Sequence, residues 1–512
     1  MIKKGITLLV VLCFLSGVAF AQSINFNVAY PVIPGVSAAA YGLMNEHDGY
    51  ILYGGTNDST YLGDPGIIKI DSVGNVVWKK YYHRSGYEFV IYQNSIELGM
   101  NVPWGGEIGV TTWLNDTSGL NPYWGLYRFD GKGDTLWTRN YQDTTNLVIS
   151  QIEIPRDNKY LIYGGWDYFP THGLGFCTIF LRKTDSLGNI IWTRTYHSTN
   201  SHIRDPAGID TCKDGGYILC AYEYDTIPNY SKLACLNGEI MIMKTDSGGN
   251  TKWIKYITNP ICDVVGASIK ALKNGGYLVC GYWDDSLNWN GNTAYTHMYM
   301  AKLNDTGSLV WSHTYGISNR QGYTVLCTTR ELPNGDIVGC GYSQDSLKKG
   351  ITGVILRTDS NGNQKWFRYY YKFYPTNEDY LSDINLTSDG GFIASGFTYD
   401  NPENFWVVKT DSLGCDTIGC NFTGIEQIKE NDIGVKVFPN PSTGQFTLSL
   451  SNVPEKCNVE VYNVLGERVE SEKVKGESEE IDLSGQPNGI YLYRVITENG
   501  GLVGSGKVII ER

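Results

Sequence analysis

Short segments in which apolar and polar residues alternate follow one another along most of the chain, and Gly, Asn or Asp residues separate them. One stretch divides into four such segments, at 268–273, 276–282, 298–304 and 309–315. Alternation with a period of two is typical of β-strands that bury one face. No amphipathic helical segment of useful length competes with this pattern, which therefore predicts an all-β protein.

This group of four segments repeats about every 57 residues, and two motifs mark the repeats. The first motif is Lys or Arg, any residue, and Asp or Asn, followed by a Gly-containing turn and by Trp, as in 183–192. The second is an Asp-Gly or Asn-Gly turn before an alternating segment, as in 214–217, which predicts a tight hairpin. A residue found in every repeat is typical of packing rather than catalysis. The repeated tryptophans, which we expect between repeats, are Trp78, Trp137, Trp192, Trp253, Trp311 and Trp366.

The basic and acidic residues of the first motif lie two apart and therefore share one face of a strand. We expect them to form surface ion pairs and Asx turns that contribute little stability.

Four strands in each repeat, arranged radially, predict the blades of a β-propeller. The seventh repeat lacks its Trp and its fourth strand, but residues 23–30 carry Phe26 and Tyr30 at the spacing of the Trp-Tyr pairs in other repeats. We therefore expect a seven-bladed β-propeller with four-stranded blades over residues 22–414, in which the N-terminal strand closes the last blade. A β-solenoid is the alternative, but its coils are shorter and its ends stay open.

The N-terminus predicts export. Lys3 and Lys4 precede an apolar segment at 6–20, and a small-x-small cleavage site ends at Ala21, so residues 1–21 form a predicted signal peptide. No later apolar run is long enough for a membrane-spanning helix, so we expect no transmembrane segment in the mature chain. With 41 Lys and Arg against 53 Asp and Glu, the net charge of −12 argues against nucleic-acid binding.

The composition changes after the repeats. Residues 415–431 are a predicted linker, and residues 432–512 contain alternating segments with Gly, Pro and Asn turns, which predict a small Ig-like β-sandwich. Two motifs stand out in this region: Phe438-Pro439-Asn440-Pro441 with Gly444, and Gly489-Ile490-Tyr491.

These motifs resemble the type A C-terminal sorting domain of the bacterial type IX secretion system. The resemblance implies that the secretion machinery recognises residues 432–512 at the outer membrane and removes them. The cargo would then be anchored at the outer cell surface or released. The whole chain thus resembles a secreted bacterial β-propeller protein that crosses the inner membrane with its signal peptide.

Cysteines suggest structural roles. Cys220, Cys280 and Cys340 occupy equivalent positions in three successive repeats, which predicts small buried core residues in separate blades rather than a metal site. Cys415 and Cys420 could close a small disulfide loop in an exported chain. No His or Cys metal-binding pattern occurs, so we expect no cofactor, with Ca²⁺ in carboxylate-rich loops as the exception.

Candidate binding residues lie in the connections that differ between repeats. In a meander these connections share one end of the blades, and five non-repeated tryptophans fall in or beside them. A lid that buries these rings over the central channel is the alternative. The candidate ligand-binding residues are Trp113, Trp124, Trp166, Trp283 and Trp289.

We therefore expect a binding or display module at the cell surface, with a glycan or a surface protein as ligand. Carbohydrate is the preferred class because aromatic rings commonly stack on sugars. The alternative is a polysaccharide hydrolase or lyase in which Asp284, Asp285, Glu378 or Asp379 serve as acid and base. Convergent carboxylates would favour the enzyme, whereas carboxylates scattered between exposed aromatic residues would favour binding.

Overall fold

The structure is a computed structural model, and its described residues form β-strands and turns without any helix. They are 25–46, 48–56, 65–82, 87–90, 108–116, 122–142, 146–153, 159–168, 176–197, 202–225, 238–258, 264–284, 296–316, 324–344, 350–372, 378–399, 402–417, 435–450, 457–463, 467–474, 476, 478–497 and 502–512. The predicted signal peptide and most of the predicted linker lie outside them. The chain divides into two compact units, residues 1–420 and 421–512. Within these described ranges, no helix is long and apolar enough to span a membrane.

The described residues of the first unit form seven four-stranded antiparallel sheets, here numbered I to VII. Six of them are meanders of consecutive strands. Sheet I holds β2 (Ala38–Glu46), β3 (Gly49–Thr56), β4 (Pro65–Asp71) and β5 (Val76–Tyr81); sheet II holds β6 (Tyr87–Val90), β7 (Ile108–Asp116), β8 (Pro122–Phe129) and β9 (Thr135–Gln142); sheet III holds β10 (Asn146–Glu153), β11 (Tyr160–Tyr168), β12 (Phe176–Thr184) and β13 (Ile190–Tyr196).

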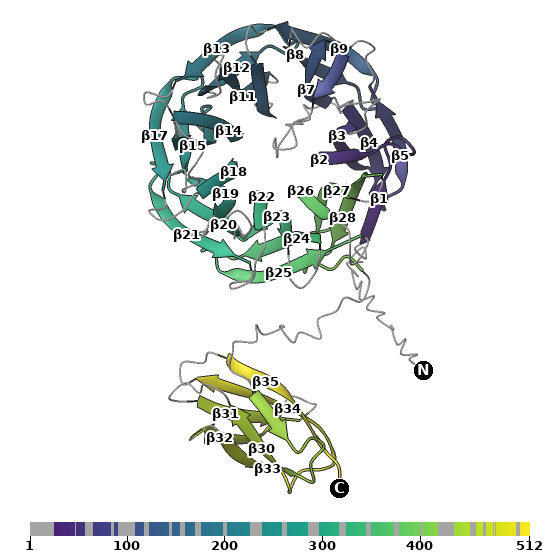
Figure 1. Cartoon of the computed structure of the whole chain (residues 1–512), viewed down its shortest axis with the longest axis vertical. Coiled ribbons are helices and arrows are strands. Elements are labelled where there is room, and N and C mark those ends of the chain that lie inside the picture. Colours follow the sequence, from purple (N-terminus) through teal and green to yellow (C-terminus); the bar gives the residue numbers. More distant parts are fainter. Residues whose placement is uncertain are drawn as a thin grey trace, which may run out of the picture. The chain divides into compact units, whose positions relative to one another are not determined.

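The remaining sheets of this unit continue the series. Sheet IV holds β14 (His202–Thr211), β15 (Tyr217–Asp225), β16 (Glu239–Thr245) and β17 (Thr251–Ile257); sheet V holds β18 (Val264–Ala271), β19 (Tyr277–Asp284), β20 (Thr296–Leu303) and β21 (Leu309–Tyr315); sheet VI holds β22 (Thr324–Glu331), β23 (Ile337–Gln344), β24 (Ile351–Thr358) and β25 (Gln364–Tyr370); sheet VII holds β26 (Asp379–Leu386), β27 (Phe392–Thr398), β28 (Asn404–Thr410) and the N-terminal β1 (Phe26–Tyr30). Figure 1 shows the sheets around a ring, with the first strand of each meander toward the centre and the last at the rim. The predicted all-β class and propeller-like arrangement are confirmed.

The strand positions in each sheet differ in burial in the way this arrangement requires. The second strand β3 is buried at every position, whereas the outermost strand β5 alternates between exposed and half-buried positions. Hydrophobic clusters join the inner strands of neighbouring sheets; one of them unites Ile218 and Ile242 of sheet IV with Val279 and Tyr299 of sheet V. The core is therefore a ring of inter-sheet interfaces.

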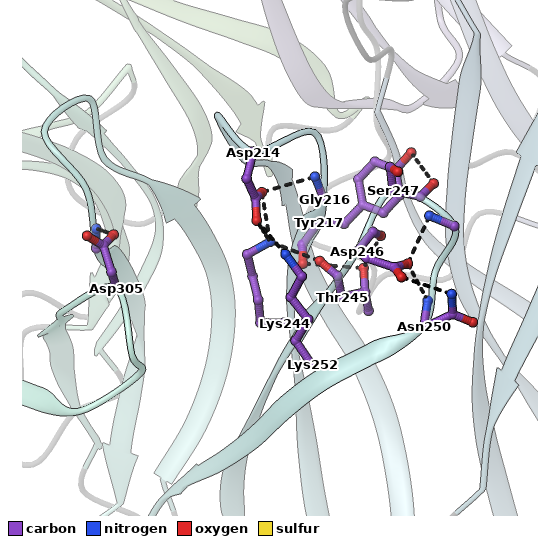
Figure 2. A network of polar contacts seen from close by, with 12 residues as sticks. Asp214, Gly216, Tyr217, Lys244, Thr245, Asp246, Ser247, Asn250, Lys252 and Asp305 are labelled. Atoms are coloured by element: carbon purple, nitrogen blue, oxygen red, sulfur yellow. Dashed lines mark hydrogen bonds and ion pairs between the residues drawn. The ribbon is translucent and has the colours of Figure 1, made fainter.

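The repeated turns between the third and fourth strands are Asx turns, and Figure 2 shows the one in sheet IV. In sheet IV, the Asp246 Oδ1 atom accepts hydrogen bonds from the backbone N–H groups of Gly248 at 2.9 Å and Asn250 at 2.8 Å. The Asn250 side chain donates to Asp246 Oδ2 at 2.9 Å. Gly249 has a φ of +78°, a conformation that residues with a Cβ rarely adopt. The prediction of Asx turns is confirmed, and it explains the Asp-x-x-Gly-Asn pattern.

The outermost strand of each sheet contacts the turn glycine of the next sheet. A Cβ on Gly249 would lie 3.0 Å from the Trp192 ring, and the Tyr196 hydroxyl donates to the Gly249 carbonyl oxygen at 2.6 Å. The predicted packing of the repeated tryptophans between repeats is thereby confirmed, and we call this contact the glycine clamp. The pairs of aromatic residue and glycine are Trp78–Gly133, Trp137–Gly188, Trp192–Gly249, Trp253–Gly307, Trp311–Gly362, Trp366–Gly414 and Phe26–Gly74.

The N-terminal strand supplies the last clamp. β1 pairs antiparallel with β28, and the Tyr30 hydroxyl donates to the Gly74 carbonyl oxygen at 2.7 Å. The fully buried Trp406 of β28 donates through its indole N–H to Asn27 Oδ1 at 2.7 Å. Strand β1 thus completes sheet VII and contacts sheet I, as the spacing of Phe26 and Tyr30 predicts.

Four of the seven repeated basic residues are buried, unlike the surface ion pairs that the sequence predicts: Lys69, Lys183, Lys244 and Lys409. Lys244 of sheet IV has a side chain only 5% exposed, and its Nζ lies 2.9 Å from Asp214 Oδ1 in the hairpin turn before β15 (Figure 2). Lys409 is 3% exposed and pairs with Asp389 in the same way. In each of these motifs the acidic residue, such as Asp246, accepts the hydrogen bonds of the Asx turn. The basic residue two positions earlier, such as Lys244, therefore pairs with a carboxylate of the hairpin turn and is buried there.

The second unit is a two-sheet structure. One sheet has the order β29 (Val435–Phe438), β30 (Gln445–Leu450) and β33 (Ser478–Asp482); the other has the order β32 (Arg468–Val474), β31 (Cys457–Tyr462), β34 (Gly489–Thr497) and β35 (Leu502–Ile510). Residues from both sheets share one core cluster, which includes Leu448, Val459 and Val495.

Deletion of residues 23–30 should lower the free energy of unfolding by several kcal/mol. The deletion removes the Phe26 and Tyr30 clamp, exposes the β28 edge and leaves the buried Trp406 N–H without its acceptor, a loss of about 1–3 kcal/mol by itself. Denaturant unfolding of the full mature chain measures the effect. Val77→Ala, at a 54% exposed position on β5, is the control and should change stability by less than about 0.5 kcal/mol. An unchanged unfolding midpoint after the deletion would contradict the closure by β1.

Asp336→Asn should destabilise the protein in a pH-dependent manner. Burial raises the pKa of Asp336, but hydrogen bonds from Lys365 and Arg357 outweigh it, and the pKa falls below its usual value. A lowered native pKa gives stability that is present at neutral pH and is lost as pH falls through that pKa. We expect a loss of about 2 kcal/mol at pH 7 that shrinks below pH ~4. Asp134→Asn, whose carboxylate pairs with Lys80 but is 68% exposed, should have little effect. Equal losses from Asp336→Asn at pH 7 and pH 3 would argue against this ion pair.

Candidate functional site

The two ends of the sheets differ in chemistry. One end carries the Asx turns and the Asp-Gly hairpins, which repeat in nearly every sheet and are occupied by structural hydrogen bonds. The opposite end receives the connections between second and third strands and those between sheets, as in 226–238 and 285–295. Because only this end differs from sheet to sheet, we call it the variable edge. Binding residues commonly lie on such variable connections of a rigid scaffold.

Four of the five predicted tryptophans lie on described strands, toward the ends that meet the variable edge. Trp113 and Trp124 are register partners on β7 and β8, while Trp166 lies near the end of β11. Trp283 is half-buried on β19, packs against the core cluster between sheets IV and V, and lies 6.2 Å from the Tyr299 ring. Trp289 lies outside the described residues. The structure brings Trp113 and Trp124 together and leaves Trp283 in another sheet.

A row of aromatic rings crosses three sheets at the variable edge. Tyr380 of β26 and Phe397 of β27 are register partners whose rings stack, with centroids 4.7 Å apart and planes 17° apart. Tyr342 of sheet VI approaches Tyr380 edge-on at 4.8 Å, and Tyr41 of sheet I lies 6.2 Å from Phe397. The strands β26 and β2 that carry Tyr380 and Tyr41 face the centre of the ring (Figure 1). We call these four residues the aromatic row.

Carboxylates accompany the aromatic row. The Tyr380 hydroxyl donates to Glu378 Oε2 at 2.9 Å, and the Tyr399 backbone N–H donates to the Glu378 carbonyl oxygen at 2.6 Å. Tyr399 is 48% exposed, whereas Glu403 is 7% exposed and its negative charge is the largest cause that raises the pKa of Tyr399. Burial raises the pKa of Tyr380, and the hydrogen bond to Glu378 raises it further.

These pKa directions limit the chemistry of the site. Tyrosines with raised pKa values stay protonated at neutral pH, so Tyr380 and Tyr399 can donate hydrogen bonds but are poor proton-abstracting bases. Glu378 is half-buried and offers carboxylate oxygens that accept hydrogen bonds from hydroxyl groups. Aromatic faces beside hydroxyl donors and a carboxylate acceptor suit a polyhydroxylated ligand.

The predicted acid–base candidates have different positions. Glu378 belongs to the cluster at the aromatic row. Asp379 is buried, and its Oδ2 accepts the backbone N–H of Lys372 at 2.8 Å, which gives it a structural contact. Asp284 is at the end of β19 in another sheet, and Asp285 lies outside the described residues.

Sequence reasoning missed the aromatic row itself. Its members come from strands that are far apart in the chain, and tyrosine is too common here, at 37 residues, to stand out. The one local signal was the succession of Glu378, Asp379 and Tyr380 directly after a connection between sheets.

The cysteines lie where the sequence predicts a core. Cys220, Cys280 and Cys340 are fully buried on β15, β19 and β23. Burial raises the pKa of the Cys340 thiol, as expected of a cysteine in the core. Cys415 is buried at the end of the last Asx turn, where its N–H donates to Asp411 Oδ1. Cys420 lies outside the described residues, so the Cys415–Cys420 disulfide stays a prediction.

In the second unit, the Phe-Pro-Asn-Pro motif holds the last strand. The Asn440 side chain donates to the Lys507 carbonyl oxygen at 3.0 Å and accepts the Ile509 N–H at 2.9 Å. The Ser442 N–H then donates to the Ile509 carbonyl oxygen at 2.8 Å. The motif therefore satisfies the outer edge of β35.

Comparisons with known proteins identify this second unit. Residues 436–511 match the family described as secretion system C-terminal sorting domain. The chain is also 25% identical over 205 residues to an endo-acting ulvan lyase of Formosa agariphila. This match covers 38% of the chain and 34% of the lyase, so the chain spans about a third of the length of that relative.

Similar solved structures include propeller proteins. The polysaccharide lyase Uly1 is 8% identical with a TM-score of 0.42, covering 77% of this chain and 93% of its own. An α-L-arabinanase of Penicillium chrysogenum complexed with arabinobiose is 13% identical with a TM-score of 0.38, covering 61% and 92%. At these scores the likenesses carry no argument about activity.

The motif geometry and the family match agree on residues 436–511. These residues are a secretion system C-terminal sorting domain, and the chain is a propeller-like protein that type IX secretion exports to the cell surface or releases from the cell.

Proposed function

We propose that this protein is an exported glycan-binding module that uses the variable edge of a closed seven-bladed β-propeller. The propeller comprises residues 22–414, and residues 432–512 form an Ig-like sandwich that directs export. The observation that carries the proposal is the aromatic row with its hydroxyl and carboxylate groups at the variable edge.

The ring of glycine clamps supports the seven blades. Every sheet contributes one aromatic residue to the turn glycine of the next sheet, and Phe26 on Gly74 links sheet VII to sheet I. A ring whose contacts return to their starting sheet leaves no sheet without a neighbour on either side. For the second unit, a core shared between two antiparallel sheets supports a sandwich.

The chemistry of the aromatic row supports a sugar ligand. Tyr380 and Phe397 form a continuous aromatic surface, and the exposed Tyr399 beside them offers a further ring and a protonated hydroxyl. The carboxylate of Glu378 disfavours an anionic ligand at this place. A neutral saccharide fits best, and Trp113, Trp124, Trp166 and Trp289 are proposed as additional sugar contacts along the same edge.

A polysaccharide hydrolase or lyase is the second candidate. Glu378 and Glu403 both raise the pKa values of Tyr380 and Tyr399, which indicates that both carboxylates lie near these two tyrosines. The partial similarity to an ulvan lyase points the same way. The raised tyrosine pKa values and the burial of Glu403 favour binding over catalysis.

Tyr399→Ala should weaken glycan binding by about tenfold or more, because an anchoring aromatic contact contributes about 2 kcal/mol. A glycan array of neutral and anionic polysaccharides with the full mature chain identifies the ligand, and calorimetric titration then measures affinity. Tyr256→Ala, at a 44% exposed tyrosine on the outer strand β17, is the matched control and should bind as the unsubstituted chain does. The melting temperature should stay unchanged in both.

Two outcomes would contradict this proposal. An array without any bound glycan would exclude the glycan-binding function. Accumulation of shortened polysaccharide products that stops in Glu378→Gln would establish the enzyme instead.

Removal of residues 432–512 should trap the chain in the periplasm, because the sorting domain is the part that the type IX machinery recognises. Cell fractionation of the source bacterium with an antibody against the propeller measures the distribution. Removal of the β1 segment instead is the control, since it weakens the fold but keeps the sorting domain. Normal surface delivery of the tailless chain would show that this domain is dispensable for export.

A further inference from the structure

The sorting domain exposes one sheet face that its own core does not use. In the sheet β32–β31–β34–β35, alternate residues point into the core cluster, such as Val459, Val461 and Val495. Their neighbours point outward. Ile490 and Leu492 on β34 are 47% and 44% exposed, although both are large apolar residues.

The register brings the outward residues of three strands, β31, β34 and β35, together. Leu492 lies opposite Tyr462 of β31 and opposite Lys507 of β35. Ile490 lies opposite the half-buried Ile509. Directly opposed residues in a sheet place their side chains on the same face. These residues therefore form one apolar patch with a basic residue at its margin, which we call the β34 face.

A buried carboxylate organises the rest of this face. Glu460 accepts hydrogen bonds from Arg494 Nε at 2.7 Å, Arg468 Nη1 at 2.9 Å and the Tyr462 hydroxyl at 2.7 Å. The Arg494 guanidinium also lies over the Tyr462 ring, 5.1 Å from its centroid. Both arginines remain about half exposed, at 51% and 56% of their side chains, while Glu460 is at 10%. The acid thus holds two cations beside the apolar patch without offering its own charge to solvent.

This arrangement is insensitive to pH over the range in which cells live. Hydrogen bonds from Tyr462, Arg494 and Arg468 lower the pKa of Glu460 to about 2. The other charged groups on this face are the basic residues Lys507, Lys473, Arg468 and Arg494. The face therefore keeps its geometry and its positive margin at the pH of the periplasm and of the medium.

The neighbouring edge of the sheet is closed to a partner. Asn440 and Ser442 occupy the backbone groups of β35 at Lys507 and Ile509. An added strand from another protein could not pair there without displacing the Phe-Pro-Asn-Pro segment. A partner that binds this side of the domain must therefore contact the side chains of the β34 face.

We propose that the β34 face is the surface through which the sorting domain docks on the type IX secretion machinery, on a receptor surface with an apolar centre and carboxylates around it. We infer this partner because residues 436–511 are a sorting domain, and a sorting domain acts with the secretion machinery. Exposed apolar residues with half-exposed arginines are typical of interface centres. This proposal is independent of the glycan-binding function.

The test substitutes the exposed residues and measures export of the full chain. We expect Ile490→Asp with Leu492→Asp to reduce the surface and secreted fraction at least tenfold in the source bacterium, with accumulation in the periplasm. Gln445→Glu with Ser478→Asp, at exposed positions on β30 and β33 of the other sheet, adds the same two negative charges to the domain and should leave export unchanged. Thermal unfolding of the purified full chains checks that the domain stays folded.

Further variants separate docking from folding and from other partners. If the Asp variants unfold, Ile490→Thr with Leu492→Thr places a β-branched residue, which favours strands, at both positions and should still lower export severalfold. Arg494→Lys should lower export less than Arg494→Glu. Normal export of folded Ile490 and Leu492 variants would overturn the proposal. Sedimentation that shows a wild-type dimer lost in these variants, with export intact, would assign the face to a second copy of this chain instead.

Discussion

The glycine clamp is the contact on which the first unit depends. An Asx turn needs a residue with positive φ, and a glycine at that position also exposes a flat patch of backbone with a carbonyl group. The aromatic ring of the preceding sheet covers this patch, and in most sheets a tyrosine hydroxyl binds the carbonyl oxygen. The turn glycine therefore has two roles: it allows the positive φ of the turn, and it forms the contact with the preceding sheet. A side chain at Gly249 or Gly362 would disturb both, because its Cβ would meet a tryptophan ring.

The clamp also explains where the molecule tolerates variation. Sheet IV has Ile257 at the position of the clamp tyrosine, yet Trp253 still covers Gly307, so the ring contact carries the interface and the hydrogen bond adds to it. Phe26 replaces tryptophan at the junction of the chain ends. All seven clamps lie near the end of the sheets that carries the Asx turns. The variable edge is free of this constraint, and residues there can diverge from sheet to sheet without loss of the interfaces.

How much the sequence predicts follows from this division. The turns, the tryptophan packing and the role of β1 were predictable because each is a local spacing that recurs, as with Phe26 and Tyr30. The buried state of Lys244 was not, since its partner Asp214 lies 30 residues away and only the folded sheet shows that it is covered. The aromatic row was not predictable either. Tyr41 and Phe397 are neighbours only because β2 packs against β27 in the folded chain, and no repeated spacing relates them.

The same distinction applies to the sorting domain, where motif residues and exposed residues have different roles. Asn440 is fixed in its position by the backbone of β35, so the motif that makes the domain recognisable in sequence is used to hold its last strand. Ile490, between the motif residues Gly489 and Tyr491, points the other way from the buried Tyr491. Alternate residues of this strand therefore have different roles. One set points into the core and builds the sandwich, and the other set points outward and remains available to a partner. The Glu460 network then keeps the arginines of that second set in place at every physiological pH.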